Sequence, residues 1–95
     1  MIDKTKDNLL EIFNYFGYKE QRNKLCEEFR ELQDELFYIY ELGNDRENLL
    51  NEGIDTISLI LQFLYDYGYT DELIINTLKD RVNRTIKRKN EGYYD

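Results

Sequence analysis

The chain has 95 residues, which is the size of one domain, and we expect residues 1–95 to form a single unit. Its 20 acidic residues outnumber 13 basic residues and give a net charge of −7, which argues against nucleic acid as a partner. The single cysteine excludes an intramolecular disulfide, and the lack of histidine excludes histidine-based nucleophilic catalysis and the usual zinc sites.

The charge is distributed unevenly along the chain. Residues 79–95 hold six basic and three acidic residues and carry a net charge of +3, so residues 1–78 carry a net charge of −10. An acidic body with a basic last segment suits a site where carboxylates hold a metal ion and arginines hold phosphate. No apolar run reaches membrane-spanning length and the first residues lack an apolar signal region, so we expect a cytoplasmic protein with no membrane partner.

Four helices are predicted, because the chain has no proline and its glycines are spaced as helix ends. The first covers residues 3–16, with Asp3 or Thr5 as its cap and Gly17 as its stop. The residues that share its apolar face are Leu9, Ile12, Phe13 and Phe16.

The second predicted helix covers residues 19–41 and carries the first acidic motif. Helical spacing places Glu28 and Glu31 on one flank of its apolar stripe, so that their carboxylates could point between helices. The stripe itself consists of Leu25, Phe29, Leu32, Leu36 and Ile39.

The third predicted helix covers residues 46–67, with Asn44 or Asp45 as its cap. It is apolar almost all round, and four short helices offer too little cover for such a helix, so we expect a subunit interface here. Gly53 stands in its interior, where glycine costs about 1 kcal/mol relative to alanine. Close approach of another backbone or of a ligand would account for a glycine at this position.

The second acidic motif, Glu52 and Asp55, occupies the polar sector of this third helix. Buried charges without partners are costly, so these two carboxylates need compensation. One reading is a structural ion pair with Lys24 or with an arginine of the last helix. The other is a divalent cation, held jointly with Glu28 and Glu31, because hard cations bind oxygen ligands and bridge carboxylates to phosphates.

The fourth predicted helix covers residues 71–90 and is capped by Thr70. Arg81, Arg84 and Arg88 recur at helical spacing on a face of their own, which is either a solvated basic face or a phosphate clamp. A different face carries the apolar stripe, which consists of Ile75, Leu78, Val82 and Ile86.

The two acidic motifs in this order resemble those of the MazG-like family of all-α nucleoside triphosphate pyrophosphohydrolases. That family places E-x-x-E on one helix and E-x-x-D on the next. The similarity covers roughly residues 15–94, including the basic ending. Its matching stretches are F-G-Y-K-E-Q at 16–21, L-C-E-E-F-R-E-L at 25–32 and N-E-G-I-D at 51–55.

The resemblance implies an all-α, four-helix bundle-like subunit that is completed by assembly into a homodimer or homotetramer. It implies hydrolysis of the α–β phosphate bond of a ribo- or deoxyribonucleoside triphosphate, giving a monophosphate and pyrophosphate. The alternatives are a phosphoribosyl-ATP pyrophosphohydrolase and a non-enzymatic helical oligomerisation or regulatory module.

The resemblance also implies roles for individual residues. Glu31, with Glu27 as the second choice, would accept the proton of the attacking water. Phe13 and Phe16 are candidates to contact the base together with Gln21, although core packing is the simpler explanation of both phenylalanines. The expected Mg²⁺ ligands, for which Mn²⁺ is a possible substitute, are Glu28, Glu31, Glu52 and Asp55. The expected pyrophosphate contacts are Lys79, Arg81 and Arg84.

Overall fold

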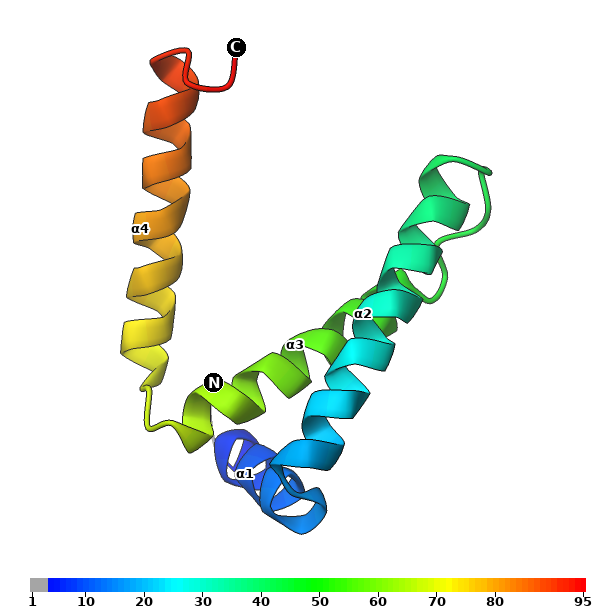
Figure 1. Cartoon of the computed structure of the whole chain (residues 1–95), viewed down its shortest axis with the longest axis vertical. Helices are drawn as coiled ribbons and strands as arrows, with labels where there is room; N and C mark the ends of the chain where they lie inside the picture. The colour runs from blue at the N-terminus through cyan, green and yellow to red at the C-terminus, as the bar shows by residue number, and fades with distance from the viewer. Residues whose placement is uncertain (1–3) are drawn as a thin grey trace.

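The computed structural model describes residues 4–95, and over that range the chain forms helices and no strand (Figure 1). The predicted all-α class is therefore confirmed. The four helices are α1 (Thr5–Phe16), α2 (Tyr18–Tyr40), α3 (Leu49–Asp66) and α4 (Asp71–Asn90).

The helix ends agree with the sequence prediction to within one residue except at two N-termini. Lys4 precedes α1 and makes no side-chain capping bond, so Thr5 is the first helical residue and not the cap; the alternative cap, Asp3, lies outside the described residues. Helix α3 begins at Leu49, three residues later than predicted, because Asn and Asp in the polar run 44–48 favour turns over helix.

The N-terminal end of α4 is as predicted. The Thr70 hydroxyl accepts a hydrogen bond from the Leu73 amide at 3.2 Å and so satisfies one of the free N–H groups of the first turn.

Helices α1, α2 and α3 pack against one another and form the body of the molecule. Gly17 makes the sharp turn between α1 and α2 with φ of 87°, a left-handed conformation that glycine adopts without strain. The Phe13 and Phe63 rings meet edge to face with centroids 5.0 Å apart. Among the described residues, the buried apolar side chains are only Leu9, Phe13, Leu59 and Tyr65.

The buried face of α2 differs from the predicted stripe. Gln21 and Glu28 are its buried residues, whereas Phe29 and Leu36 are exposed. The face that meets α3 is therefore rotated about the helix axis toward Glu28, and this carboxylate lies inside the helix contact and not on its flank. The reason is that the apolar residues of α2 spread over a broad arc, and the position of α3 decides which part of that arc is covered.

Helix α3 is covered on one face only. Thr56, Leu59 and Gln62 face the body and are buried. The opposite face, at the spacing i, i+4, i+7, i+11 and i+14, is apolar and open, and we call it the α3 outer face. It consists of Leu50, Ile54, Ile57, Leu61 and Leu64, of which the first three are exposed and the last two half-buried.

Helix α4 packs on none of the other three helices and extends away from the body (Figure 1). The link between α3 and α4 contains Gly68 at φ 91°, and the Tyr65 hydroxyl donates a hydrogen bond to the Asp71 carboxylate across it. A single chain thus forms a three-helix body with a projecting helix, so the expected bundle-like arrangement of four helices, completed by assembly, is not formed within one chain. The apolar residues of α4 are left exposed as a result, and we call the set Ile75, Leu78, Val82 and Ile86 the α4 stripe.

None of the described helices combines the length and the apolarity that crossing a bilayer requires.

Two buried amides join α2 to α3, since Gln21 Nε2 donates to Gln62 Oε1 at 2.8 Å. Replacement of Gln62 by Leu should lower the free energy of unfolding by about 1–3 kcal/mol, because the Gln21 amide is left buried without a partner. The double variant Gln21→Leu/Gln62→Leu should recover most of this loss. Urea unfolding measures both effects, and equal destabilisation of the single and double variants would contradict the prediction.

Candidate metal centre

Three glutamates from two helices converge on the side of the body where α2 packs against α3. Glu28 and Glu31 stand one turn apart on α2, and Glu52 comes from the first turn of α3. One carboxylate oxygen from each lies within 4.8 Å of the other two. Glu28 is buried, Glu52 half-buried and Glu31 exposed, so the group opens to solvent on the Glu31 side. We call these three residues the carboxylate cluster.

Two oxygens of the carboxylate cluster lack partners. Glu28 is only 5% exposed, and its Oε2 atom is buried with no hydrogen bond; the same holds for Oε2 of Glu52. A buried carboxylate oxygen without a donor is costly and uncommon, because water no longer solvates it. Both atoms are therefore free to bind a cation.

The electrostatics of the cluster also favour the binding of a cation. Burial and the neighbouring charges of Glu31 and Glu28 raise the pKa of Glu52 above its ordinary value of 4.5, with smaller contributions from Asp55 and Glu35. Like charges at close range disfavour ionisation of each other. A divalent cation would remove this repulsion. Hard divalent cations also prefer oxygen ligands, which are what the three carboxylates provide.

Lys24 supplies the positive charge that lies beside the cluster. Its Nζ atom is 3.2 Å from Glu28 Oε1 and 3.9 Å from Glu27 Oε2. The hydrogen bond to Glu28 is the main reason that the pKa of Lys24 is raised. The sequence left open an ion pair of Lys24 with Glu52 or Asp55. The structure pairs Lys24 with Glu27 and Glu28 of α2 instead, and within residues 4–95 Glu52 and Asp55 form no ion pair.

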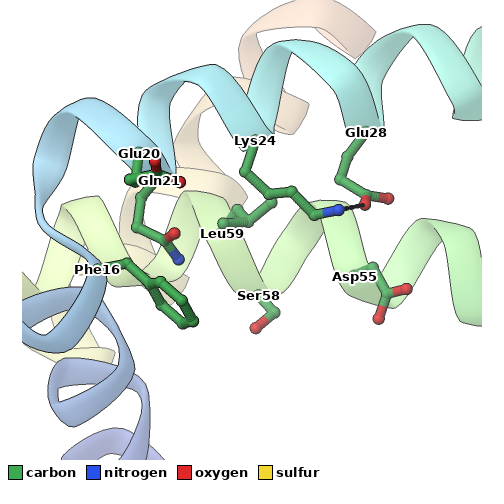
Figure 2. A pocket seen from close by; sticks show the side chains of 8 residues that line it. All are labelled: Phe16, Glu20, Gln21, Lys24, Glu28, Asp55, Ser58 and Leu59. Carbon is green, nitrogen blue, oxygen red and sulfur yellow. Dashed lines mark ion pairs between the residues drawn. The ribbon is translucent and has the colours of Figure 1, made fainter.

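A groove of about 450 Å³ begins beside Glu28 and runs along α2 and α3 (Figure 2). Phe16 lines its far end, next to Gln21, and Lys24 extends along it toward Glu28. Asp55, the fourth expected ligand, lines the groove on the α3 side but is exposed and does not belong to the cluster of three. The groove therefore joins an aromatic ring and an amide at one end to carboxylates at the other.

The other expected site residues are distributed over three places. Phe13 is packed in the core and is 5% exposed, so it does not line the groove. Glu27 is exposed and turned toward Lys24, outside the cluster. The basic residues expected to hold pyrophosphate are all exposed on α4, which does not pack on the body: Lys79, Arg81 and Arg84.

Lys24 lines this groove as a further functional candidate, which was not predicted from the sequence. Its position four residues before Glu28 was the available signal, since i and i+4 share a helix face. An ammonium group next to a carboxylate cluster can neutralise an anionic substrate as well as an unoccupied carboxylate.

Comparison of the chain with protein-family models, with curated proteins and with solved structures finds no match.

The raised pKa of Glu52 predicts how the metal-free protein responds to pH. The folded state holds this proton more tightly than the unfolded chain, so Glu52 favours folding at pH below 4.5, and the contribution disappears as the pH rises through the raised pKa. Urea unfolding with chelator at about pH 4 and pH 7 should therefore show Glu52→Gln gaining stability over the wild type as the pH rises. Glu41→Gln, at an exposed carboxylate outside the cluster, gives the baseline; an equal trend in both variants would contradict the prediction.

The contact between Lys24 and Glu28 predicts competition with a metal ion. Lys24→Met should tighten Mg²⁺ or Mn²⁺ binding by up to about fivefold, because a half-exposed ion pair contributes at most about 1 kcal/mol. Lys24→Arg, which keeps the charge, should leave the affinity close to that of the wild type. Isothermal titration calorimetry measures both, and weaker binding by Lys24→Met would mean that the lysine supports the metal ligands and does not compete with the ion.

Proposed function

We propose that this protein is a Mg²⁺-dependent nucleotide pyrophosphohydrolase, which cleaves the α–β phosphate bond of a ribo- or deoxyribonucleoside triphosphate. The products would be the nucleoside monophosphate and pyrophosphate. The observation that carries the proposal is the carboxylate cluster, in which Glu28 and Glu52 each keep a buried oxygen without a hydrogen-bond donor. The resemblance of the two acidic motifs to the MazG-like family gives the reaction class.

The donor set fits magnesium. All three side chains offer carboxylate oxygens, two of the oxygens are unpartnered, and the cluster is open on the Glu31 side, where waters and phosphate oxygens can complete the coordination. Glu28, Glu31 and Glu52 would hold the ion, with Asp55 as a further ligand from the rim of the groove. Mn²⁺ could substitute for it. When bound, the ion neutralises polyphosphate charge and lowers the pKa of coordinated water.

The residues around the ion divide the remaining tasks. Glu31 is the exposed member of the cluster, so it is best placed to accept a proton from water that enters from solvent; Glu27 is turned toward Lys24 and is the weaker candidate. Lys24 would leave Glu28 to contact a phosphate once the cluster is neutralised. Phe16, half-exposed beside Gln21, offers a ring face to a base at the other end of the groove.

The proposal includes assembly into a homodimer or homotetramer. Lys79, Arg81 and Arg84 lie on a helix that packs on no other helix of its own chain. A role for them at the pyrophosphate therefore requires a second copy of the chain or a rearrangement of α4.

The decisive test is a screen of the common NTPs, dNTPs and phosphoribosyl-ATP with Mg²⁺, in which pyrophosphate release is measured. Chelator should abolish the release. Glu28→Gln should reduce it by more than the roughly 10- to 100-fold that the loss of an outer-shell partner costs. Glu41→Gln should leave it unchanged. In ¹⁸O-labelled water the label should appear in the monophosphate, because water attacks the α-phosphorus.

The same variants separate an enzyme from a helical module that hydrolyses nothing. If Glu28 only forms a structural ion pair with Lys24, Glu28→Gln will destabilise the apoprotein, and Mg²⁺ will not change its melting temperature. If the cluster serves a metal, Glu28→Gln will preserve or raise the stability of the apoprotein and will abolish its stabilisation by Mg²⁺. Stable protein that releases no pyrophosphate from any substrate would overturn the proposed function.

A further inference from the structure

A second groove lies on the body, where the turn between α1 and α2 meets the last turn of α3. Its volume is about 410 Å³, which is in the size range of small-molecule sites. It shares no lining residue with the groove beside the carboxylate cluster. We call it the aromatic groove. Its aromatic side chains are Phe13, Tyr18, Phe63 and Tyr67, and its other lining residues are Asn14, Gly17 and Asp66.

The aromatic side chains are held in two ways. Phe13 is buried and meets Phe63 edge to face, so these two rings form a packed base. Tyr18 and Tyr67 are more open, at 56% and 82% exposed, and stand at the solvent side of the groove. The face of an aromatic ring is the negative side of its quadrupole, so rings gathered around one space attract a cation into it.

The charge around the aromatic groove has the same sign. Asp66 lines the groove without a basic neighbour in its wall, and no residue of the described range 4–95 forms an ion pair with it. Helices α1 and α3 both end here, with no basic residue in either last turn, so the negative ends of two helix dipoles add to Asp66. Helix α2 begins at the same turn, but Glu20 in its first turn offsets the positive end of its dipole.

The walls of the groove determine which kind of cation fits. Mg²⁺ and Ca²⁺ require several oxygen ligands, whereas this groove offers a single carboxylate among aromatic rings. An organic ammonium group carries its charge on methyl or methylene groups. These can pack against the rings while the charge is balanced by the ring faces and by Asp66.

We propose that the aromatic groove binds an organic ammonium cation of small-molecule size, with its charged head between the tyrosine rings and Asp66. The site is separate from the carboxylate cluster, and its occupation does not depend on whether that cluster hydrolyses a nucleotide. It gives a role to two exposed tyrosines that stand beside a carboxylate without a counter-charge.

The first test is a titration of the full chain with choline at constant ionic strength, followed by two-dimensional NMR of the backbone amides. Choline should shift the signals of Gly17 and Tyr67 saturably. Its neutral analogue 3,3-dimethylbutan-1-ol, which has the same shape without the charge, should bind about fivefold more weakly or not at all. The absence of a saturable shift, or equal binding of the neutral analogue, would overturn the proposal.

The second test uses variants at exposed positions, which leave the packed base intact. Asp66→Asn and Tyr67→Leu should each weaken choline binding by about two- to fivefold, the size expected for one solvent-exposed cation–π contact or ion pair. The matched changes Asp80→Asn and Tyr40→Leu, at exposed positions outside the groove, should leave the affinity unchanged. Equal affinity in all four variants would overturn the proposal. Circular dichroism checks the fold, and Tyr18→Leu replaces Tyr67→Leu if that variant is unfolded.

A peptide with one trimethyllysine tests the source of the cation, because it presents the head group of choline on a protein side chain. The volume of the groove favours the free cation. Displacement of the peptide by choline at the Gly17 and Tyr67 signals supports the proposal. Binding of the peptide without binding of choline would overturn the assignment to a small molecule.

Discussion

The proposed function depends on the contact between α2 and α3. It buries Glu28 between two helices and brings Glu52 from the opposite helix to meet it. A carboxylate removed from water is stable only with compensation, and the chain provides one lysine for the pair. Two buried oxygens remain without donors, and the proposed metal site and the proposed chemistry both rest on them.

The helices and the acidic motifs could be predicted from the sequence because each depends on local spacing. Glycine stops, the Thr70 cap and the three-residue interval between Glu28 and Glu31 are properties of a few neighbouring residues. Once α2 and α3 pack as an antiparallel pair, Glu52 comes close to Glu28 and Glu31. The order of the two acidic motifs along the chain already indicated this.

What the sequence did not reveal depends on how the helices are placed in space. Periodicity marked an apolar arc on α2 but could not tell which part of it α3 would cover, so Glu28 was expected on a flank and Phe29 in the core. The same limit applies to α4, whose apolar stripe indicates that it packs on something but does not identify the partner. Asp55 is a third case. It lies about one helical turn after Glu52 on α3, and at that position its side chain is exposed on the rim of the groove, outside the cluster.

The hydrogen bond between Gln21 and Gln62 has a consequence for the carboxylates, although it touches none of them. Apolar helix surfaces tolerate sliding, because one leucine can replace another in a contact, whereas two amides pair at one setting only. A slip of α3 along α2 by one turn, about 5.4 Å, would separate the amides and carry Glu52 away from Glu28 by a similar distance. The amide pair thus fixes the position of α3 along α2, and with it the separation of Glu28 and Glu52, from two helical turns away along α2.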